Sequence, residues 1–519
     1  MRLILAALAL FCLALPAKAQ TWWEAETAHF IIKSRDSEAA TREFAAQVER
    51  FDRGLRFLNG LDENHSQASR ANKPVIYRFG DFNDMARMAG APGSGIAGFF
   101  ISRAGRAVAF VPTRGFTTNN SRERRGPVRE NPAEVLFHEY THYFMMQNFP
   151  AAYPGWYSEG YAEMLSTMRF LDGGAFHIGD PPQSRAFQIF QMQSFRLHEM
   201  LDSNHRMSRR DAFQQYGTGW LLTHYLSFNP EREQVLRNYL IALGNGANSL
   251  ETAREMFGDL RALERELDRY KGGPFPGYTV RPNITSEPAV AMRQLGEDEV
   301  ALINHEMRLQ VGVTESSART VARDLRNLAG RFPESAAVQR WLAEAEYDSK
   351  NYAAADEAAA RALGIDADNV DALLYRAMAS IEMAKVDPAY LATARQHLAA
   401  AVRLDDEDPR AMILYYRTYY DETDGQPPEN AIVALEQALD HAGMDVEYRL
   451  MLGRQLVLED RLPEARIVML PVLFRGHAVT PERDDRPTPQ GILDALAAND
   501  RDRTLDLINR LLKPDDEQA

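Results

Sequence analysis

The first part of the chain alternates short apolar runs with longer amphipathic segments. His29–Lys33 (HFIIK) and Lys73–Arg78 (KPVIYR) are apolar runs bounded by polar or turn residues, which is typical of strands. Between them, Glu38–Phe57 carries apolar residues at helical spacing, and Gly98–Val111 has the pattern of two strands joined by a turn. The pattern therefore predicts an α+β domain, which we place at residues 20–273.

A stretch rich in glycine and proline interrupts this pattern at residues 271–283 (KGGPFPGYTVRPN). We interpret residues 274–294 as a linker between two domains. A second domain is expected at residues 295–476, followed by capping helices and a tail at residues 477–519.

Beyond the break the chain becomes alanine-rich, and its helical pattern repeats. Similar helices begin around five alanines, separated by 37, 39, 37 and 34 residues: Ala318, Ala355, Ala394, Ala431 and Ala465. The clearest unit is RWLAEAEYDSKNYAAADEAAARALGIDAD, residues 340–368. Six of its residues lie where a tetratricopeptide repeat has its packing residues: Leu342, Ala343, Tyr352, Ala355, Ala359 and Ala362.

Residues 295–476 thus resemble the tetratricopeptide-repeat family. The resemblance implies an all-α solenoid in which stacked helix pairs bury what one pair could not bury alone. An unrelated helical array is the alternative. Either structure would be a binding or scaffolding module for a protein partner, and no catalytic cluster is evident in it.

The segment that begins at residue 131 predicts a helix with two histidines on one face. Asn131-Pro132-Ala133-Glu134 has an N-cap residue, a proline at the first helical position and a glutamate at the third. In a helix from there to Met146, His138 and His142 are four residues apart and share a face. Two neutral imidazoles in this relation can bind one zinc ion, and Glu139 between them can reach the metal-bound water.

A catalytic zinc ion takes three protein ligands, so a third ligand is expected downstream. After a loop broken by Pro150 and Pro154, a second helix is predicted from near Tyr157. Its Glu159 and Glu163 are four residues apart and point the same way. One can bind the metal while the other holds a ligand histidine by a hydrogen bond. The spacing alone does not decide which glutamate takes which role.

The motif HEYTH followed by WYSEGYAE resembles the gluzincin clan of metallopeptidases, particularly its peptidase-MA-like members found beside tetratricopeptide repeats. Gluzincins place the ligand glutamate in an Asn-Glu-Gly or similar context, which Ser158-Glu159-Gly160 matches. The metzincin pattern is rejected, because Met145 and Asn148 stand where a glycine and a histidine would follow. The resemblance implies one zinc ion and the following roles: His138, His142 and Glu159 as its ligands, Glu139 as general base, and Glu163 as the hydrogen-bond partner of a ligand histidine.

A second similarity lies at residues 216–226 (YGTGWLLTHYL), which resemble the Tyr-x-x-Gly helix of the aminopeptidase branch. By this resemblance Tyr216 donates a hydrogen bond to the oxyanion. Two departures argue against aminopeptidase activity. Only sixteen residues separate His142 from Glu159, fewer than that branch usually has, and its Gly-x-Met-Glu-Asn sequence is missing before the metal helix. We therefore expect an endopeptidase acting on a peptide or protein substrate.

A second function, of a different class, remains open. The chain could be a zinc-fold scaffold without turnover that binds partners through its repeats. The intact Glu139 favours the peptidase, because the fold alone would need only the metal ligands.

Composition and charge limit the class of protein and the partners to be expected. A chain of 519 residues is too long for a single hydrophobic core, so at least two domains are expected. Its 45% hydrophobic and 25% charged residues lie in the range of soluble globular proteins. The net charge of −14 argues against nucleic acid or an anionic membrane surface as the main partner.

The N-terminus has the pattern of a signal peptide. Arg2 precedes the apolar run Leu3–Leu15, which is shorter than the roughly 20 residues of a spanning helix. Ala17-Lys18-Ala19 then predicts cleavage before Gln20. The one cysteine, Cys12, lies in the predicted signal peptide, so the mature chain would have no disulfide, which favours a bacterial periplasm. No long apolar segment follows, and we expect no membrane span in the mature chain.

Overall fold

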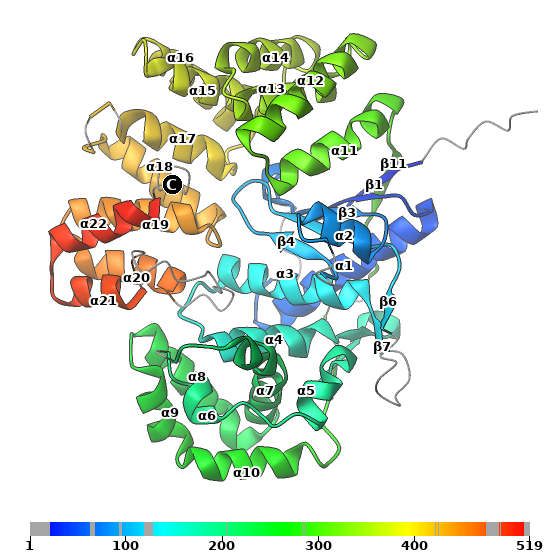
Figure 1. Ribbon diagram of the computed structural model, residues 1–519, viewed down its shortest axis with the longest axis vertical. Helices are drawn as coiled ribbons and strands as arrows, with labels where there is room; N and C mark the ends of the chain where they lie inside the picture. The colour runs from blue at the N-terminus through cyan, green and yellow to red at the C-terminus, as the bar shows by residue number, and fades with distance from the viewer. Residues whose placement is uncertain are drawn as a thin grey trace, which may run out of the picture.

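The structure is a computed structural model, and it describes residues 21–62, 68–92, 96–118, 128–203, 205–283, 286–420, 422–423, 425–473, 487 and 489–512. The predicted signal peptide, residues 1–19, lies outside these ranges. Within them the chain is mostly helical, with a small sheet in the N-terminal part and a helical array in the C-terminal part (Figure 1).

A six-stranded sheet with the order β11-β1-β2-β3-β5-β4 forms one layer of the N-terminal part. Its strands are β1 (Trp23–Glu26), β2 (Ile31–Ser34), β3 (Val75–Arg78), β4 (Phe99–Ile101), β5 (Val108–Val111) and β11 (Ala291–Gln294). Strands β2, β3 and β5 are parallel, and β4 lies antiparallel to β5 at one edge. The apolar runs interpreted as strands are confirmed as β2, β3 and the β4–β5 hairpin.

Helix α1 (Glu38–Leu58) confirms the amphipathic segment predicted between the first two strands. Its N-cap is Ser37, whose side chain accepts a hydrogen bond from the helix backbone. On its buried side the ring of Phe51 stacks on the ring of Phe137 in α3 (Pro132–Asn148), with centroids 4.0 Å apart. Helix α1 thus joins the sheet to the helix that carries both candidate histidine ligands.

The remaining elements of the N-terminal part surround these layers. Its other helices are α2 (Phe82–Met88), α4 (Gly155–Ser166), α5 (Ala186–Phe190), α6 (Leu197–Met200), α7 (Arg209–Ser227), α8 (Pro230–Gly244), α9 (Ser249–Phe257) and α10 (Leu260–Tyr270). Two small sheets pair β6 (Phe116–Thr118) with β7 (Val128–Glu130), and β9 (Phe176–Ile178) with β8 (Arg169–Phe170) and β10 (Tyr278–Val280).

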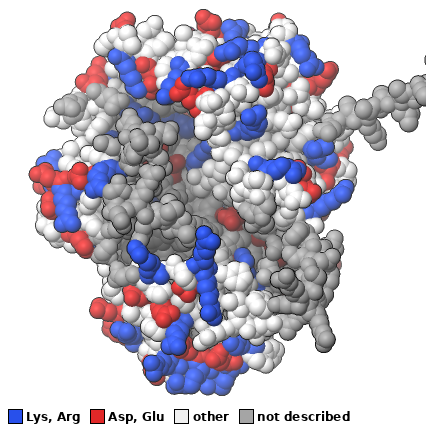
Figure 2. Space-filling model, in the orientation of Figure 1, with Lys and Arg blue, Asp and Glu red and all other residues white. Residues whose placement is uncertain are grey.

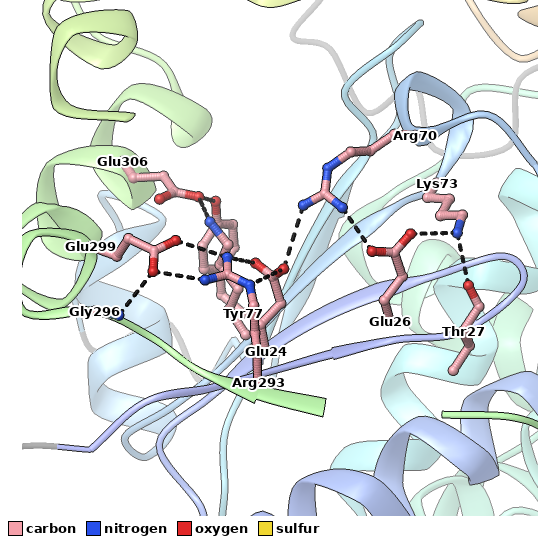
Figure 3. Close-up of polar contacts among 11 residues, drawn as sticks. Glu24, Glu26, Thr27, Arg70, Lys73, Tyr77, Arg293, Gly296, Glu299 and Glu306 are labelled. Carbon is pink, nitrogen blue, oxygen red and sulfur yellow. Dashed lines mark hydrogen bonds and ion pairs between the residues drawn. The ribbon is translucent and has the colours of Figure 1, made fainter. Parts of the chain in front are cut away.

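The segment predicted as a linker, residues 274–294, carries two paired strands. Strand β10 pairs with β9, and β11 pairs antiparallel with β1. Opposite Glu24 in this register, Arg293 donates to the carboxylates of both Glu24 and Glu299, at 2.7–3.0 Å (Figure 3). The segment is therefore not an unpaired connection. It is held against the N-terminal sheets because their edge strands supply its backbone partners.

The C-terminal part is an array of helix pairs. Its helices are α11 (Glu297–Val311), α12 (Glu315–Arg331), α13 (Ala336–Asp348), α14 (Tyr352–Ile365), α15 (Val370–Ala384), α16 (Tyr390–Leu404), α17 (Pro409–Tyr420), α18 (Glu429–His441), α19 (Val446–Leu458), α20 (Leu462–Leu473), α21 (Pro489–Ala497) and α22 (Arg501–Leu512). The five alanines of the sequence period lie near the starts of α12, α14, α16, α18 and α20, and all five are fully buried. The predicted helical repeat is confirmed.

The array curves back onto the N-terminal part (Figure 1). At its first helix, the hydroxyl of Tyr77 in β3 donates to Glu306 of α11 (Figure 3). At the turn between α18 and α19, the amide of Gln147 in α3 donates to the carbonyl oxygen of His441 at 3.1 Å. Ala442 is buried in the hydrophobic core of the N-terminal part. The array therefore contacts the N-terminal part both at α11 and at the turn between α18 and α19.

The described surface mixes charges of both signs. On the face shown in Figure 2, lysine and arginine side chains are interspersed with aspartate and glutamate over the upper and lower helices. Among the described residues, no helix combines the length and the apolar character that crossing a membrane requires.

Candidate metal centre

Helix α3 begins as its sequence predicts. The side chain of Asn131 accepts a hydrogen bond from the amide of Ala133 at 3.1 Å, and Pro132 occupies the first helical position. The four-residue spacing then places the rings of His138 and His142 on one side of the helix, with their Nε2 atoms 3.2 Å apart. The two imidazoles converge on a single point in front of α3.

The third donor comes from α4, which crosses next to α3. The Oε2 atom of Glu159 is 3.2 Å from Nε2 of His138 and 3.6 Å from Nε2 of His142, and its side chain is 1% exposed. Tetrahedral zinc with bonds of about 2.0–2.2 Å places its ligand atoms about 3.3–3.6 Å apart. Two imidazole nitrogens and one carboxylate oxygen at these separations fit a zinc ion and leave a fourth position to water or substrate.

The approach of α4 to α7 depends on glycines. A Cβ atom on Gly160 would be 2.3 Å from the carbonyl oxygen of Gly219, and a Cβ atom on Gly219 would be 2.6 Å from that of Trp156. The backbones of the two helices therefore touch at the position directly after Glu159. This contact gives a packing reason for the glycine in the Ser-Glu-Gly motif and brings Tyr216, one turn before Gly219, toward the site.

The second nitrogen of each histidine also faces a polar side chain. Nδ1 of His138 is 3.4 Å from Oε1 of Glu163, and Nδ1 of His142 is 3.0 Å from Oγ of Ser158. In the tautomer that presents Nε2 to a metal, the Nδ1–H of His142 donates to Ser158, which fixes the orientation of that ring, and the Nδ1 of His138 faces the carboxylate of Glu163 at ion-pair distance. Glu163 therefore lies beside His138. The contact of Ser158 was not predicted, although Ser158 directly precedes Glu159 in the quoted motif.

Arg185 completes this arrangement from the far side. Its Nε donates to Oε1 of Glu163 at 2.7 Å, so that Glu163 bridges Arg185 and His138. Its guanidinium carbon also lies 4.5 Å from the centroid of the Tyr216 ring. Sequence reasoning missed Arg185 because it sits in a short 3₁₀ turn, Gln183–Arg185, that carries no motif.

The buried carboxylates set the charge of the site. Burial by itself lowers the pKa of His138, but the negative charges of Glu163 and Glu159 outweigh burial and raise this pKa to about 9. The two carboxylates thus favour a positive charge between them, which either a proton on His138 or a divalent cation supplies. The charge of the site and its donor atoms therefore both fit a zinc ion.

Glu139 and Tyr216 face one cavity in front of the donors. The cavity has a volume of about 240 Å³, and its lining includes Ala97, His138, Glu139, Glu163, Arg185 and Tyr216. The rings of Tyr216 and His138 have centroids 6.1 Å apart. Burial and the charge of Glu159 raise the pKa of Tyr216 well above its usual value, so its hydroxyl keeps the proton needed for donation.

A second cluster of histidine and carboxylates lies beneath α3 and is part of the core. Nδ1 of His29 is 2.7 Å from Glu49. Asp52 accepts from Arg56 at 2.6 Å and from the hydroxyl of Tyr140 at 2.7 Å. Because Tyr140 belongs to α3, this network ties the candidate metal helix to α1. Its charges are paired inside the domain, so it has the character of a structural network.

Comparisons with known proteins add little to this geometry. The sequence matches no protein-family model, and no curated protein matches it. Among solved structures, MamA 41-end from Desulfovibrio magneticus RS-1 is 18% identical, with a TM-score of 0.28, over 35% of this chain and 98% of that chain. The MamA RS-1 ArsTM double mutant is 18% identical, with a TM-score of 0.27, over 34% of this chain and 93% of that chain. At such TM-scores the likeness supports no inference about function, and the gluzincin resemblance stays a prediction.

Proposed function

We propose that the protein is a zinc-dependent metallopeptidase that hydrolyses peptide bonds. One observation carries the proposal: Glu139 opens onto the same cavity as His138, directly beside the His138–His142–Glu159 donor set. A zinc site that only stabilised the fold would be closed by a fourth protein ligand, whereas here a carboxylate and a phenol line the cavity beside three donors.

The residues of the chain divide the chemistry among them. Zinc held by the donor set would supply Lewis-acid activation of a water molecule and of the scissile carbonyl. Glu139 takes the proton of the attacking water and then delivers it to the departing amine. Tyr216, which keeps its proton, donates to the oxygen on which negative charge develops. Glu163 and Arg185 hold the ring of His138 in place throughout.

The proposed substrate is an internal peptide bond of a polypeptide, and the proposed location is the bacterial periplasm. The cavity in front of Glu139 is open to a peptide side chain, and the aminopeptidase sequence that would read a free amine is missing before α3. The location rests on the signal peptide predicted at residues 1–19.

A second candidate is a scaffold that keeps the zinc fold and binds a protein partner through the helical array. The paired helices from α11 to α20 favour it, because stacked helix pairs form extended binding surfaces. A zinc-loaded protein that cleaves no member of a broad peptide library would support this candidate against the peptidase.

Glu139→Gln tests the peptidase most directly. The variant keeps the donor set, so it should retain one zinc ion per chain while turnover falls by about 10²–10⁴-fold. Glu43→Gln on the exposed face of α1 is the matched control and should leave both values unchanged. Metal content and cleavage of the peptide library are measured on the same preparations. Full turnover in Glu139→Gln would overturn the mechanism, and a wild-type chain that takes up no zinc would overturn the site.

A further inference from the structure

The turn that joins β4 to β5 leaves the sheet and ends inside the helical array. In Figure 1 the loop beyond β4 points into the curve that the array makes. Gly105 has a φ of +64°, a left-handed conformation that allows the tight turn. A Cβ atom at this position would be 2.5 Å from Nε of Arg410 in α17, so the tip of the turn is in direct contact with the array.

The turn contacts the first helix of successive pairs. Arg103 donates to the carbonyl and side-chain oxygens of Gln310 in α11 at 2.5 and 2.6 Å. The amide of Ala104 donates to Asp445, the N-cap of α19, at 2.9 Å. Arg106 contacts α13 and α15, and Gly105 lies against α17. The turn therefore contacts α11, α13, α15, α17 and the N-cap of α19. We call these helices the inner face of the array.

Arg106 is enclosed by the inner face. Its Nη1 donates to Glu344 of α13 at 2.9 Å and to the hydroxyl of Tyr375 in α15 at 3.0 Å. Its guanidinium carbon lies 5.3 Å from the ring centroid of Trp341, and its Nη2 lies 3.6 Å from Oδ2 of Asp371. The side chain is only 15% exposed. A buried guanidinium needs this kind of pairing, because one left without a partner is strongly destabilising.

The neighbouring charges of the inner face are paired as well. Asp371 lies 2.8 Å from Arg340 and 2.7 Å from Arg410, and Arg410 also reaches Asp408 at 2.6 Å. Glu344 and Asp371 remain available to pair with one further guanidinium, and Arg106 of the same chain provides it.

The other end of β4 lies at the catalytic cavity. Ala97, two residues before the strand, lines the cavity together with Glu139. The ring of Phe100 lies against Tyr143 of α3, with centroids 5.4 Å apart. Strand β4 is at the edge of its sheet and has only three residues, so the described pairing to β5 holds it on one side alone. A strand this short needs support from outside the sheet.

We infer that the helical array positions β4 beside Glu139, and that Arg106 is the residue through which it does so. The chain's own β4–β5 turn occupies the inner face where it contacts α11 to α19, so a protein partner of the scaffold candidate would bind elsewhere on the array. The array acts as an internal clamp on one wall of the cavity. The catalytic consequence rests on the proposed peptidase function, whereas the clamp itself does not.

Hydrogen exchange on the full-length, zinc-loaded protein tests the clamp independently of activity. In Arg106→Ala, peptides covering residues 97–107 should exchange at least about tenfold faster, while peptides from α3 and the zinc content stay as in wild type. Arg323→Ala on the exposed side of α12 is the control and should change neither region. Arg106→Lys, which keeps the charge but loses the forked geometry, should give an intermediate rate.

Peptide kinetics on the same variants test the catalytic consequence. Ala97, which leads into β4, lines the cavity away from the proposed reacting atoms. Arg106→Ala should therefore raise KM by about tenfold and change kcat by less than about threefold. Unchanged exchange at residues 97–107, or a uniform increase over the whole chain, would overturn the clamp. If Arg106→Ala does not fold, Tyr375→Phe removes one hydroxyl partner of Arg106 and should show the same local increase on a smaller scale. A wild-type protein without peptidase activity would refute the proposed function and leave the exchange result decisive for the clamp.

Discussion

Gly160 and Gly219 bring α4 and α7 into backbone contact at the candidate zinc site. A Cβ atom on Gly160 would approach the carbonyl oxygen of Gly219 to 2.3 Å, a distance that forces the helices apart. Glu159 precedes the first glycine, and Tyr216 lies one turn before the second. The separation of the two helices therefore sets how far the carboxylate of Glu159 lies from the phenol of Tyr216.

Gly160→Ala should accordingly lower both stability and zinc affinity. The added methyl group cannot be accommodated against backbone, so we expect a loss of about 1–3 kcal/mol in the free energy of unfolding. Urea unfolding and a zinc titration measure the two effects. Gly330→Ala in α12 is the control: no atom lies within 4 Å of its Cβ position, and alanine should be neutral or stabilise by up to about 1 kcal/mol. Equal behaviour of the two variants would contradict the packing argument.

Glu159 and Glu163 should differ in their effect on zinc affinity. Glu159→Ala removes one of three donors and should abolish tight binding. Glu163→Ala leaves the donors in place but removes the carboxylate that faces His138 and accepts from Arg185, so affinity should fall by about 10–100-fold. A competition titration with a zinc chelator ranks the two variants. The reverse ranking would exchange the two assignments.

Local signals in the sequence were sufficient to predict the helices that carry His138, His142 and Glu159. Asn131 and Pro132 mark the start of α3, and the four-residue spacing then fixes that His138 and His142 share a face. The repeated alanines marked the second helix of each pair, because only a small side chain fits where two helices pack closely. The first signal acts within one or two helical turns, and the second recurs every 34 to 39 residues, so both can be read from one sequence.

The contacts missed by sequence reasoning join residues far apart in the chain. Arg185 reaches Glu163 from a short turn 22 positions away, and Arg106 reaches Glu344 across 238 positions. The sequence around Gly105 indicates a hairpin, but nothing local specifies what its tip will contact. The pairing of β11 with β1 was missed for the same reason, since residues 274–294 show only their glycines and prolines.

Tyr216→Phe should slow turnover without altering the fold. Phenylalanine keeps the ring beside His138 and under the guanidinium of Arg185 and removes only the hydroxyl. If that hydroxyl stabilises the oxyanion, kcat should fall by about 10²-fold with little change in KM. Steady-state kinetics on a short peptide measure both values, and zinc content serves as the control for an intact site. Wild-type kinetics would show that Tyr216 only packs.

Asp348, the last residue of α13, should make the stability of the array depend on pH. Burial and the nearby charge of Glu344 raise the pKa of Asp348 from 3.8 to about 7, against the opposing effect of Arg106 and Arg103. Between about pH 4 and pH 7 the folded protein therefore holds a proton that the unfolded chain has released. Stability contributed by this group falls as pH rises through that window and is lowest above pH 7.

Asp348→Asn keeps the neutral form at every pH and should remove this loss. The variant should match wild type near pH 4 and have a higher unfolding midpoint at pH 8, measured by urea titration at both values. Asp506→Asn on the exposed side of α22 controls for the change in net charge and should show no such difference. A gain of Asp348→Asn over wild type that is the same at pH 4 and pH 8 would show that Asp348 titrates normally. Because Arg106 lowers the pKa of Asp348, adding Arg106→Ala to otherwise wild-type protein should raise that pKa and steepen the loss of stability toward pH 8, which links this carboxylate to the clamp on β4.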